Sequence, residues 1–252
     1  MKRLLVLFFL QYFWLSNVHA ENKTIVFVSI LPQQYIVSQI GTDLVDVRVM
    51  VGPGQSPATY EPTPQQMAAL SKADVYFRIG VPFESAWLDK IKLNNKNLII
   101  VECCDLISDL KAESNSHDTD YDPHVWTSPK NVIKIAELIK NYLIKVDEKN
   151  TDSYTTMEKE FKEKLLVLDK NIKDKIKNLK DRILIVAHPS WGHFSNEYGF
   201  TQVSMEREGK EIQARSLVRL IKMAKLNNIK AIFTQPQFND RAAKVIANEL
   251  NA

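Results

Sequence analysis

Short apolar runs alternate with helix-period segments after residue 20, and this alternation limits the choice of folds more than any other feature. The apolar runs of strand length in the first part of the chain cover residues 24–30, 45–51, 75–79 and 98–101. Helical periodicity covers residues 33–40 and 64–73. Continuous apolar runs are typical of buried parallel strands, which need crossover helices between them. We therefore expect an α/β lobe whose parallel sheet is flanked by helices.

The middle of the chain changes to long helices. Residues 129–146 are predicted to form one helix, with Ser128 as its cap and Pro129 in its first turn. A second, longer helix begins at Thr151 or Asp152 and reaches about residue 179. Its apolar residues recur every three or four positions, and a helix of this length spans roughly 40 Å. Such a stripe fits a coiled-coil dimer arm and equally a helix that packs across two lobes.

The last part of the chain returns to alternation. Apolar runs cover residues 183–187, 202–205 and 231–233, and helices are expected at residues 213–226 and 240–250. The predicted fold is α/β, with two lobes of parallel sheet joined by a long linking helix. We assign residues 21–128 to the N-terminal lobe, 129–180 to the helical connector and 181–252 to the C-terminal lobe. Because an α/β lobe normally continues into another strand, we expect this lobe to be incomplete, with a truncated C-terminus or a natural end there.

The N-terminus has the form of a secretory signal peptide. Lys2 and Arg3 form a basic start, residues 4–14 are mostly apolar, and Val18-His19-Ala20 matches a cleavage site. We therefore predict that residues 1–20 are removed and that the mature protein, from Glu21, is periplasmic. The apolar run is not followed directly by a cysteine, so no lipid anchor is expected.

Charge and cysteine content narrow the function classes. Removal of Lys2 and Arg3 lowers the formal net charge from +3 to +1, which argues against nucleic acid as the main partner. Cys103 and Cys104 are adjacent, and neighbouring cysteines rarely form a disulfide without strain. We interpret both as buried or half-buried thiols, with redox or metal roles as the alternative.

Two of the histidines in the mature chain follow predicted strands or end a lobe. His124 lies in the loop that closes the first lobe, and His188 follows the apolar run 183–187. Ligands of open parallel sheets bind at the carboxyl ends of the strands, so this pair is a candidate metal site. Two imidazoles with a carboxylate or water complete a tetrahedral zinc site. Each histidine alone fits a turn residue bonded to backbone equally well.

The carboxylate candidates lie in the charged segment after residue 205, and we select Glu206 as the metal ligand, with Glu208 and Glu211 as alternatives. A solvated charged turn is the competing interpretation of this segment. His117 is interpreted as a loop residue or a metal-collecting group. His193 is expected to pack near Trp191 and Phe194.

Signatures of catalysis are missing from the sequence. The turn Gly52-Pro53-Gly54 lacks the spacing and the lysine of a nucleotide-binding loop. The chain carries neither a GxSxG nor an HExxH motif. Since no general base stands beside His124 or His188, we predict a binding protein and not an enzyme. A secreted metalloenzyme is the alternative, because two histidines and a water resemble an open catalytic zinc site.

Five motifs in order resemble the zinc/manganese solute-binding proteins of ABC transporters. They are GQSPATYEPTP (54–64), ALSKADVYFRIG (69–80), DPHVWTSP (122–129), AHPSWGHFSNEYG (187–199) and FTQPQFNDRAA (233–243). The resemblance covers nearly the whole mature chain. It implies two α/β lobes joined by a rigid helix, a metal ion held in the cleft between them, and delivery of that ion to a membrane ABC permease.

The resemblance also implies which positions bind the metal. The family's first ligand, a histidine, is replaced here by Ala58, which leaves Tyr60 or Glu61 as substitutes. The second and third positions are His124 and His188. Members that favour manganese often carry glutamate at the third position, so zinc is the expected cargo, with manganese second. The fourth ligand, an acidic residue, falls beyond residue 252.

Two further functions stay open. The loss of the first histidine is compatible with a two-lobed protein that binds a chelated or organic ligand. Some relatives are called adhesins, and sequence does not separate that role from transport. In either case we expect a monomer that does not bind nucleic acid.

Overall fold

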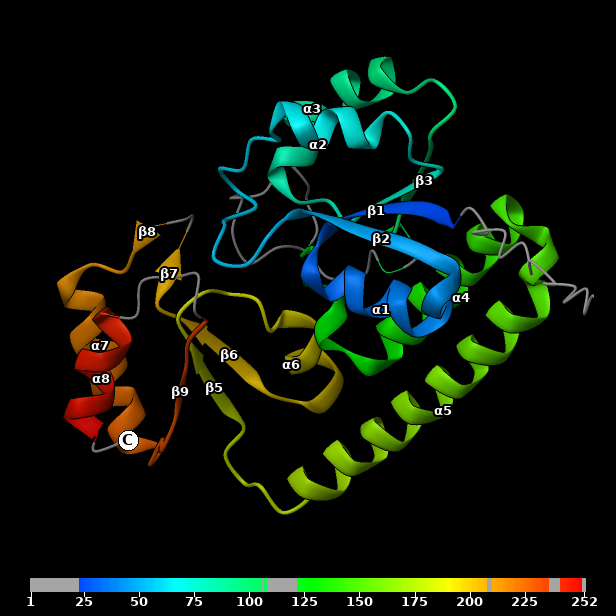
Figure 1. Cartoon of the computed structure of the whole chain (residues 1–252). Helices are drawn as coiled ribbons and strands as arrows, with labels where there is room; N and C mark the ends of the chain where they lie inside the picture. The colour runs from blue at the N-terminus through cyan, green and yellow to red at the C-terminus, as the bar shows by residue number, and fades with distance from the viewer. Residues whose placement is uncertain (1–22, 106, 108–121, 208–209, 236–240, 251–252) are drawn as a thin grey trace, which may run out of the picture.

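The computed structural model describes residues 23–105, 107, 122–207, 210–235 and 241–250 (Figure 1). The chain forms two parallel β-sheets with helices packed around them, as the alternation of apolar runs predicts. Within the described ranges, no helix has both the length and the apolar character needed to cross a membrane.

The first sheet contains four parallel strands in the order β2-β1-β3-β4. Their bounds are Thr24–Ile30 for β1, Val45–Val51 for β2, Val75–Arg78 for β3 and Ile99–Glu102 for β4. The central strand β1 pairs with β2 and β3, and Val26 faces Val47 on one side and Val75 on the other. Strands flanked on both edges and covered on both faces need apolar residues throughout, which explains the continuous apolar runs.

Helices cover both faces of this sheet (Figure 1). The helices α2 (Pro64–Leu70) and α3 (Pro82–Asn94) lie on one side, and α1 (Leu31–Gly41) and α4 (Pro129–Val146) on the other. The short 3-10 helix η1 (Thr42–Leu44) leads from α1 into β2. The helix α3 was not among the predicted elements, although Pro82 begins it and apolar residues recur within it. The predicted cap of α4 is present, because the Ser128 hydroxyl accepts from the backbone of Asn131.

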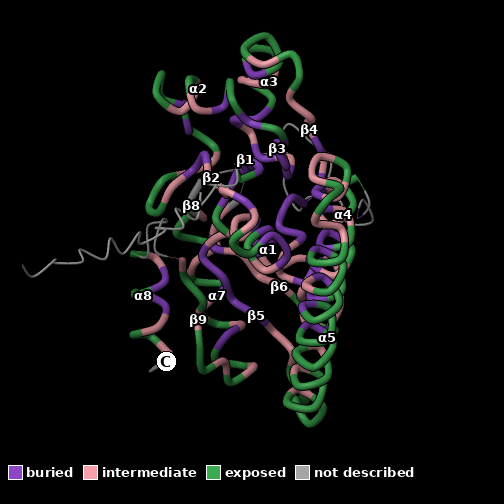
Figure 2. The backbone as a smooth tube through the Cα atoms, turned by 45° about the vertical axis from the view of Figure 1, so that its right-hand side comes forward, coloured by how far each residue is buried: buried purple, intermediate pink, exposed green. Residues whose placement is uncertain are grey.

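The linking helix is α5 (Thr151–Ile176), which follows the 3-10 helix η3 (Glu148–Asn150) and ends three residues before the predicted end. Its first half packs on α1 and α4 through buried residues that include Tyr154, Phe161 and Leu165. Beyond these residues the helix leaves the first lobe, and Leu168 is exposed even though it continues the predicted stripe. Figure 2 shows the change from buried to exposed backbone along α5. Along the first half of α5, the apolar stripe therefore packs against other helices of the same chain.

The second sheet is smaller and also parallel, with the order β6-β5-β9. Its strands are β5 (Ile183–Val186), β6 (Thr201–Ser204) and β9 (Ile232–Phe233). Its helices are α6 (Gly192–Tyr198), α7 (Ala214–Leu226) and α8 (Arg241–Leu250). The strands β7 (Glu206–Arg207) and β8 (Lys210–Glu211) form an antiparallel pair beside it. A separate apolar core fills this lobe, built around Ile185, Leu220 and Ile246.

The two lobes touch directly near the start of α4. The helix α6 of the second lobe packs against the 3-10 helix η2 (Val125–Thr127), which precedes α4. On the same side, the Tyr198 hydroxyl donates to Asp169 of α5 at 3.0 Å. These contacts bring the loops that follow the strands of both sheets together. The fold is therefore the predicted pair of α/β lobes joined by a long helix.

Candidate metal centre

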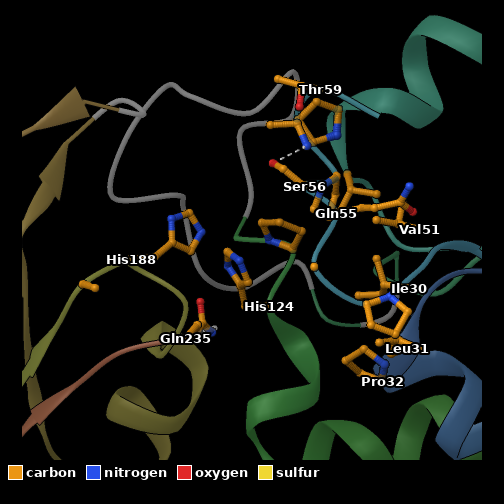
Figure 3. Close-up of a pocket in the computed structure, with 18 of the residues that line it drawn as sticks. Ile30, Leu31, Pro32, Val51, Gln55, Ser56, Thr59, His124, His188 and Gln235 are labelled. Atoms are coloured by element: carbon orange, nitrogen blue, oxygen red, sulfur yellow. Dashed lines mark hydrogen bonds between the residues drawn. The ribbon is translucent and has the colours of Figure 1, made fainter. Parts of the chain in front are cut away.

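A cavity of about 740 Å³ lies between the two lobes (Figure 3). The first lobe contributes the residues after β1, the loop 51–59 and the segment around His124. The second lobe contributes Ala187 and His188 after β5, together with Met205, Glu206 and Gln235. Both predicted imidazoles therefore lie in one cavity at the carboxyl ends of the strands, where ligands of open α/β sheets bind.

His124 is held by a carboxylate of its own loop. Asp122 Oδ1 lies 2.6 Å from His124 Nδ1 and accepts the backbone N–H of His124 at 2.9 Å. Burial alone would raise the pKa of Asp122, but the hydrogen bonds and charge of His124 outweigh it, and the pKa lies below its usual value. Because an ionised carboxylate only accepts, the proton of the neutral ring sits on Nδ1. The ring nitrogen Nε2 then carries the lone pair that a metal needs.

His188 has the same arrangement in the second lobe. Glu206 Oε2 lies 2.9 Å from His188 Nδ1, so this ring also places its proton on Nδ1 when neutral. The backbone of Glu206 is fixed by Ser204, whose hydroxyl accepts the Glu206 N–H at 3.1 Å and donates to the Glu206 carbonyl at 2.8 Å. Glu206 thus contacts the side of the imidazole opposite Nε2.

The two imidazole rings lie close to each other across the lobes. Their centroids are 5.3 Å apart and their planes make an angle of 74°. Figure 3 shows His124 and His188 side by side at one end of the cavity. Histidines that bind metals usually donate their other ring N–H to a carboxylate, which fixes the tautomer and the orientation of the ring. Here both rings have that carboxylate, and they come from different lobes.

Gln235, just after β9, adds an oxygen at the same cavity. Its Nε2 donates to Ser190 Oγ at 2.9 Å, which fixes the amide group. Its Oε1 is buried and, within the described part of the chain, has no hydrogen-bond partner. In Figure 3 this oxygen points toward the two imidazole rings. A buried acceptor without a protein partner indicates a bound water or ion. The sequence signal was the motif FTQPQF, in which we assigned no role to the glutamine.

The loop 51–59 forms the opposite wall and presents neutral groups. Ala58 lines the cavity, and so do Gln55, Ser56 and Thr59. Gly54 has a φ of 76°, a left-handed conformation that the turn of this loop requires.

The substitutes that we considered for the missing histidine of this loop do not reach the cavity. The Tyr60 hydroxyl donates to Gln66, and Glu61 is exposed; neither residue lines the cavity. The sequence-based suggestion that one of them replaces the first ligand is therefore not supported by the geometry.

The other acidic and histidine candidates are distributed differently. Glu208 and His117 lie outside the described residues, and the side chain of Glu211 is not described. Among the residues that the structure does describe, no three His, Cys, Asp or Glu side chains gather closely enough to hold a metal ion. The side chains brought together are thus two imidazoles, each with its own carboxylate, and the Gln235 amide.

His193 makes polar contacts that were not expected from sequence. The Trp191 and Phe194 rings on either side of it meet edge to face, with ring centroids 5.6 Å apart. The His193 ring is buried and bonds to the first lobe instead: its Nε2 lies 2.9 Å from the Asp122 carbonyl, and its Nδ1 lies 3.2 Å from Asn131 Nδ2. The expectation of packing near Trp191 and Phe194 left out these polar partners, which residues distant in sequence supply to both ring nitrogens.

Neither cysteine lines this cavity. Cys103 and Cys104 are free thiols, one buried and one half-buried, as expected for adjacent cysteines. Burial is the main reason why the pKa of each thiol is raised far above its usual value. Both therefore remain protonated and unreactive near neutral pH.

Comparison with known proteins agrees with the fold. The manganese ABC transporter substrate-binding lipoprotein PsaA of Streptococcus mitis is 29% identical over 232 residues, covering 86% of this chain and 73% of that protein. A putative metal-binding protein of Chlamydia muridarum is 26% identical over 231 residues, covering 90% of this chain and 81% of that protein.

Solved structures give the same result. A crystal structure of ZnuA superposes with a TM-score of 0.85 at 38% identity, covering 92% of this chain and 89% of that one. A ZnuA deletion mutant with zinc bound gives a TM-score of 0.84 at the same identity, covering 92% of this chain and 88% of that one. The model of the family described as zinc-uptake complex component A, periplasmic, matches residues 26–252. The chain therefore belongs to the ZnuA family of metal-binding components of ABC importers.

Proposed function

We propose that this protein captures zinc outside the cytoplasm and delivers it to the membrane permease of an ABC importer. The observation that carries the proposal is the pair His124 and His188, which come from different lobes and face each other at 5.3 Å between ring centroids, each with a carboxylate on Nδ1. Imidazole nitrogens suit zinc, whereas manganese prefers carboxylate and water oxygens. Zinc is accordingly the first cargo and manganese the second.

The ligand set follows from the ring geometry. His124 and His188 bind the ion through Nε2, and the Gln235 oxygen and water are the remaining donors. Glu206 contacts the opposite side of the His188 ring, which favours an orienting role for this residue over direct ligation. A tetrahedral zinc site needs four donors, so two imidazoles with two oxygens suffice.

Transport follows from ligation across the lobes. An ion bound by both lobes stabilises the loaded arrangement by its binding free energy, and the permease can distinguish this state from the empty one. The protein acts as an extracytoplasmic monomer, and its partners are the ion and the permease. Membership of a solute-binding family fits a binding role and not catalysis.

The test is zinc and manganese binding by chelator competition on residues 21–252. His124→Ala and His188→Ala should each weaken zinc binding about tenfold or more, which is about 1.4 kcal/mol or more. Tyr60→Phe is the matched control, because its hydroxyl bonds to Gln66 and the residue does not line the cavity. Affinity should also fall below about pH 6, since only unprotonated imidazole binds a metal. Tight zinc binding that neither histidine variant changes would disprove the assignment.

The cavity also supports a second cargo class. A volume of about 740 Å³ is within the range of small-molecule sites, and far exceeds what a bare ion occupies. A zinc ion that carries a small organic chelator would fill this space, with the chelator against the neutral loop 51–59. Calorimetry with zinc alone and with preformed zinc–histidine or zinc–citrate complexes separates the two. A complex that binds more tightly than the free ion would favour the chelate.

A further inference from the structure

His193 is a residue of the second lobe whose polar contacts lie in the first. Its side chain lies in α6 and the residue is only 5% exposed. A backbone carbonyl only accepts, so the His193 Nε2–H donates to the Asp122 carbonyl at 2.9 Å. The Asn131 amide group donates to Nδ1 at 3.2 Å. Both ring nitrogens therefore have partners in the first lobe.

The contact reaches the metal-binding ring through Asp122. The backbone of this residue is held by His193, and its carboxylate accepts from both the N–H and the Nδ1–H of His124. A displacement of the Asp122 backbone would move the carboxylate and turn the His124 ring with it. The orientation of the His124 imidazole thus depends on a residue of the other lobe.

Gly192 provides a second contact at the same point. A Cβ atom at this position would lie 2.4 Å from Asp122 Oδ2, so the start of α6 approaches the carboxylate more closely than any other residue type allows. The same carboxylate is bonded to His124 through Oδ1 and cannot move away freely. The start of α6 therefore adjoins both polar groups of Asp122: His193 bonds to its carbonyl, and Gly192 leaves room for its carboxylate.

We propose that His193 is a positioning residue, which fixes Asp122 from the second lobe and thereby orients His124 for the metal. The inference rests on the proposed function, because it assumes that His124 binds the ion. It adds that the ligand of one lobe is oriented by the other before any ion arrives.

Two substitutions separate hydrogen bonding from packing. His193→Gln keeps a group that can accept from Asn131 and donate to the Asp122 carbonyl, whereas His193→Phe keeps only the ring shape. Ser195→Ala is the matched control, because Ser195 is buried in the same helix and its hydroxyl has no hydrogen-bond partner within the described residues.

The readouts are zinc affinity by chelator competition and the visible absorption spectrum of bound Co²⁺, which reports ligand geometry. His193→Phe should weaken zinc binding about tenfold and change the Co²⁺ spectrum. His193→Gln and Ser195→Ala should stay within about twofold of the parent protein, with an unchanged spectrum. A folded His193→Phe protein with parental affinity and spectrum would overturn the inference, and so would a His193→Gln protein as impaired as His193→Phe.

Two further measurements cover the remaining outcomes. If His193→Phe does not fold, Asn131→Ala loosens the His193 ring while leaving it in place, and it should weaken zinc binding about threefold; unchanged binding would overturn the inference. Nitrogen-15 NMR of the metal-free protein should show His124 in the Nδ1–H tautomer in the parent and as a tautomer mixture in the weakened variant. A parent protein that binds neither zinc nor Co²⁺ would refute the proposed function, and the tautomer measurement would still decide the positioning role.

Discussion

The two halves of the candidate metal centre use the same chemistry but differ in how firmly it is held. In the first lobe, Asp122 is buried, lies 2.6 Å from the His124 ring and is also fixed by α6. In the second lobe, Glu206 belongs to a two-residue strand and lies 2.9 Å from the His188 ring. Its backbone is held by the Ser204 hydroxyl and by the pairing of Glu206 with Glu211 in the equally short strand β8.

The difference shows where the site is built and where it adjusts. A buried carboxylate with several fixed partners orients its imidazole before the ion arrives, so little ordering remains to be done on binding. A carboxylate on a short strand pair leaves its imidazole more freedom. We therefore regard the Asp122–His124 pair as the preformed half and the Glu206–His188 pair as the half that adapts to the ion.

The largest effect that separates the halves is expected from removing the two carboxylates. Asp122→Ala should lower zinc affinity by about 10- to 100-fold, because the ring loses its orienting acceptor and its loop loses a backbone contact. Glu206→Ala should cost about tenfold or less. Chelator competition on the two variants side by side checks the order, and a greater loss for Glu206→Ala would reverse our comparison.

A methyl group at Gly192 should disturb the preformed half without removing any group. Gly192→Ala places a Cβ 2.4 Å from Asp122 Oδ2, and we expect a loss of about 1–3 kcal/mol in the free energy of unfolding, with weaker zinc binding. Gly52→Ala is the control, since its Cβ would meet only the flexible end of Gln55 at 3.3 Å. Equal stability of the two variants in urea titrations would show that Asp122 is not held as tightly as we argue.

Substitution of Gln235 tests the half of the site that contains Glu206 and His188. Gln235→Leu removes the buried oxygen while keeping the size of the side chain, and it should weaken zinc binding about threefold to tenfold if that oxygen binds the ion or its water. Gln235→Glu supplies a charged oxygen and should bind zinc at least as tightly as the parent. If both variants retain the parental affinity in chelator competition, the amide takes no part in binding.

The smallest effect concerns a carboxylate without an imidazole, Glu102 in the first lobe. Its burial raises its pKa to about 7, although Arg78 lies 2.8 Å away and opposes the shift. Between about pH 4.5 and 7 the unfolded chain releases this proton and the folded chain keeps it, so stability falls as the pH rises through this window. Glu102→Gln should therefore be about 1–2 kcal/mol more stable than the parent at pH 8 and equally stable at pH 4.

Urea titrations at both pH values check this prediction. A Glu102→Gln protein that is less stable than the parent at pH 8 would mean that the pair with Arg78 outweighs the burial. The pKa values of Glu102 and Asp122, two carboxylates of the same lobe, are shifted in opposite directions. Burial dominates at Glu102, whereas the hydrogen bonds and charge of His124 dominate at Asp122.

Much of the architecture could be predicted from local patterns. The apolar runs identified the strands of the first sheet, and the cap at Ser128 identified the start of α4. These features depend on residues that are neighbours in sequence, which is why periodicity detects them. The helix α3 was overlooked although Phe83, Trp87 and Ile91 recur every four residues, and α6 was overlooked because it spans only residues 192–198.

For the candidate site too, local sequence predicted some features and only the tertiary structure supplied the others. The sequence by itself determined that His188 follows a strand and that His124 lies in the loop that closes the first lobe, and ligands of open α/β sheets bind at the carboxyl ends of the strands. Only the tertiary structure decided that Asp122 and Glu206 occupy the Nδ1 sides of the rings, that Gln235 faces them, and that His193 crosses to the other lobe. Hydrogen bonds and ring contacts between residues distant in the chain depend on distances of a few ångströms, which local sequence patterns do not encode.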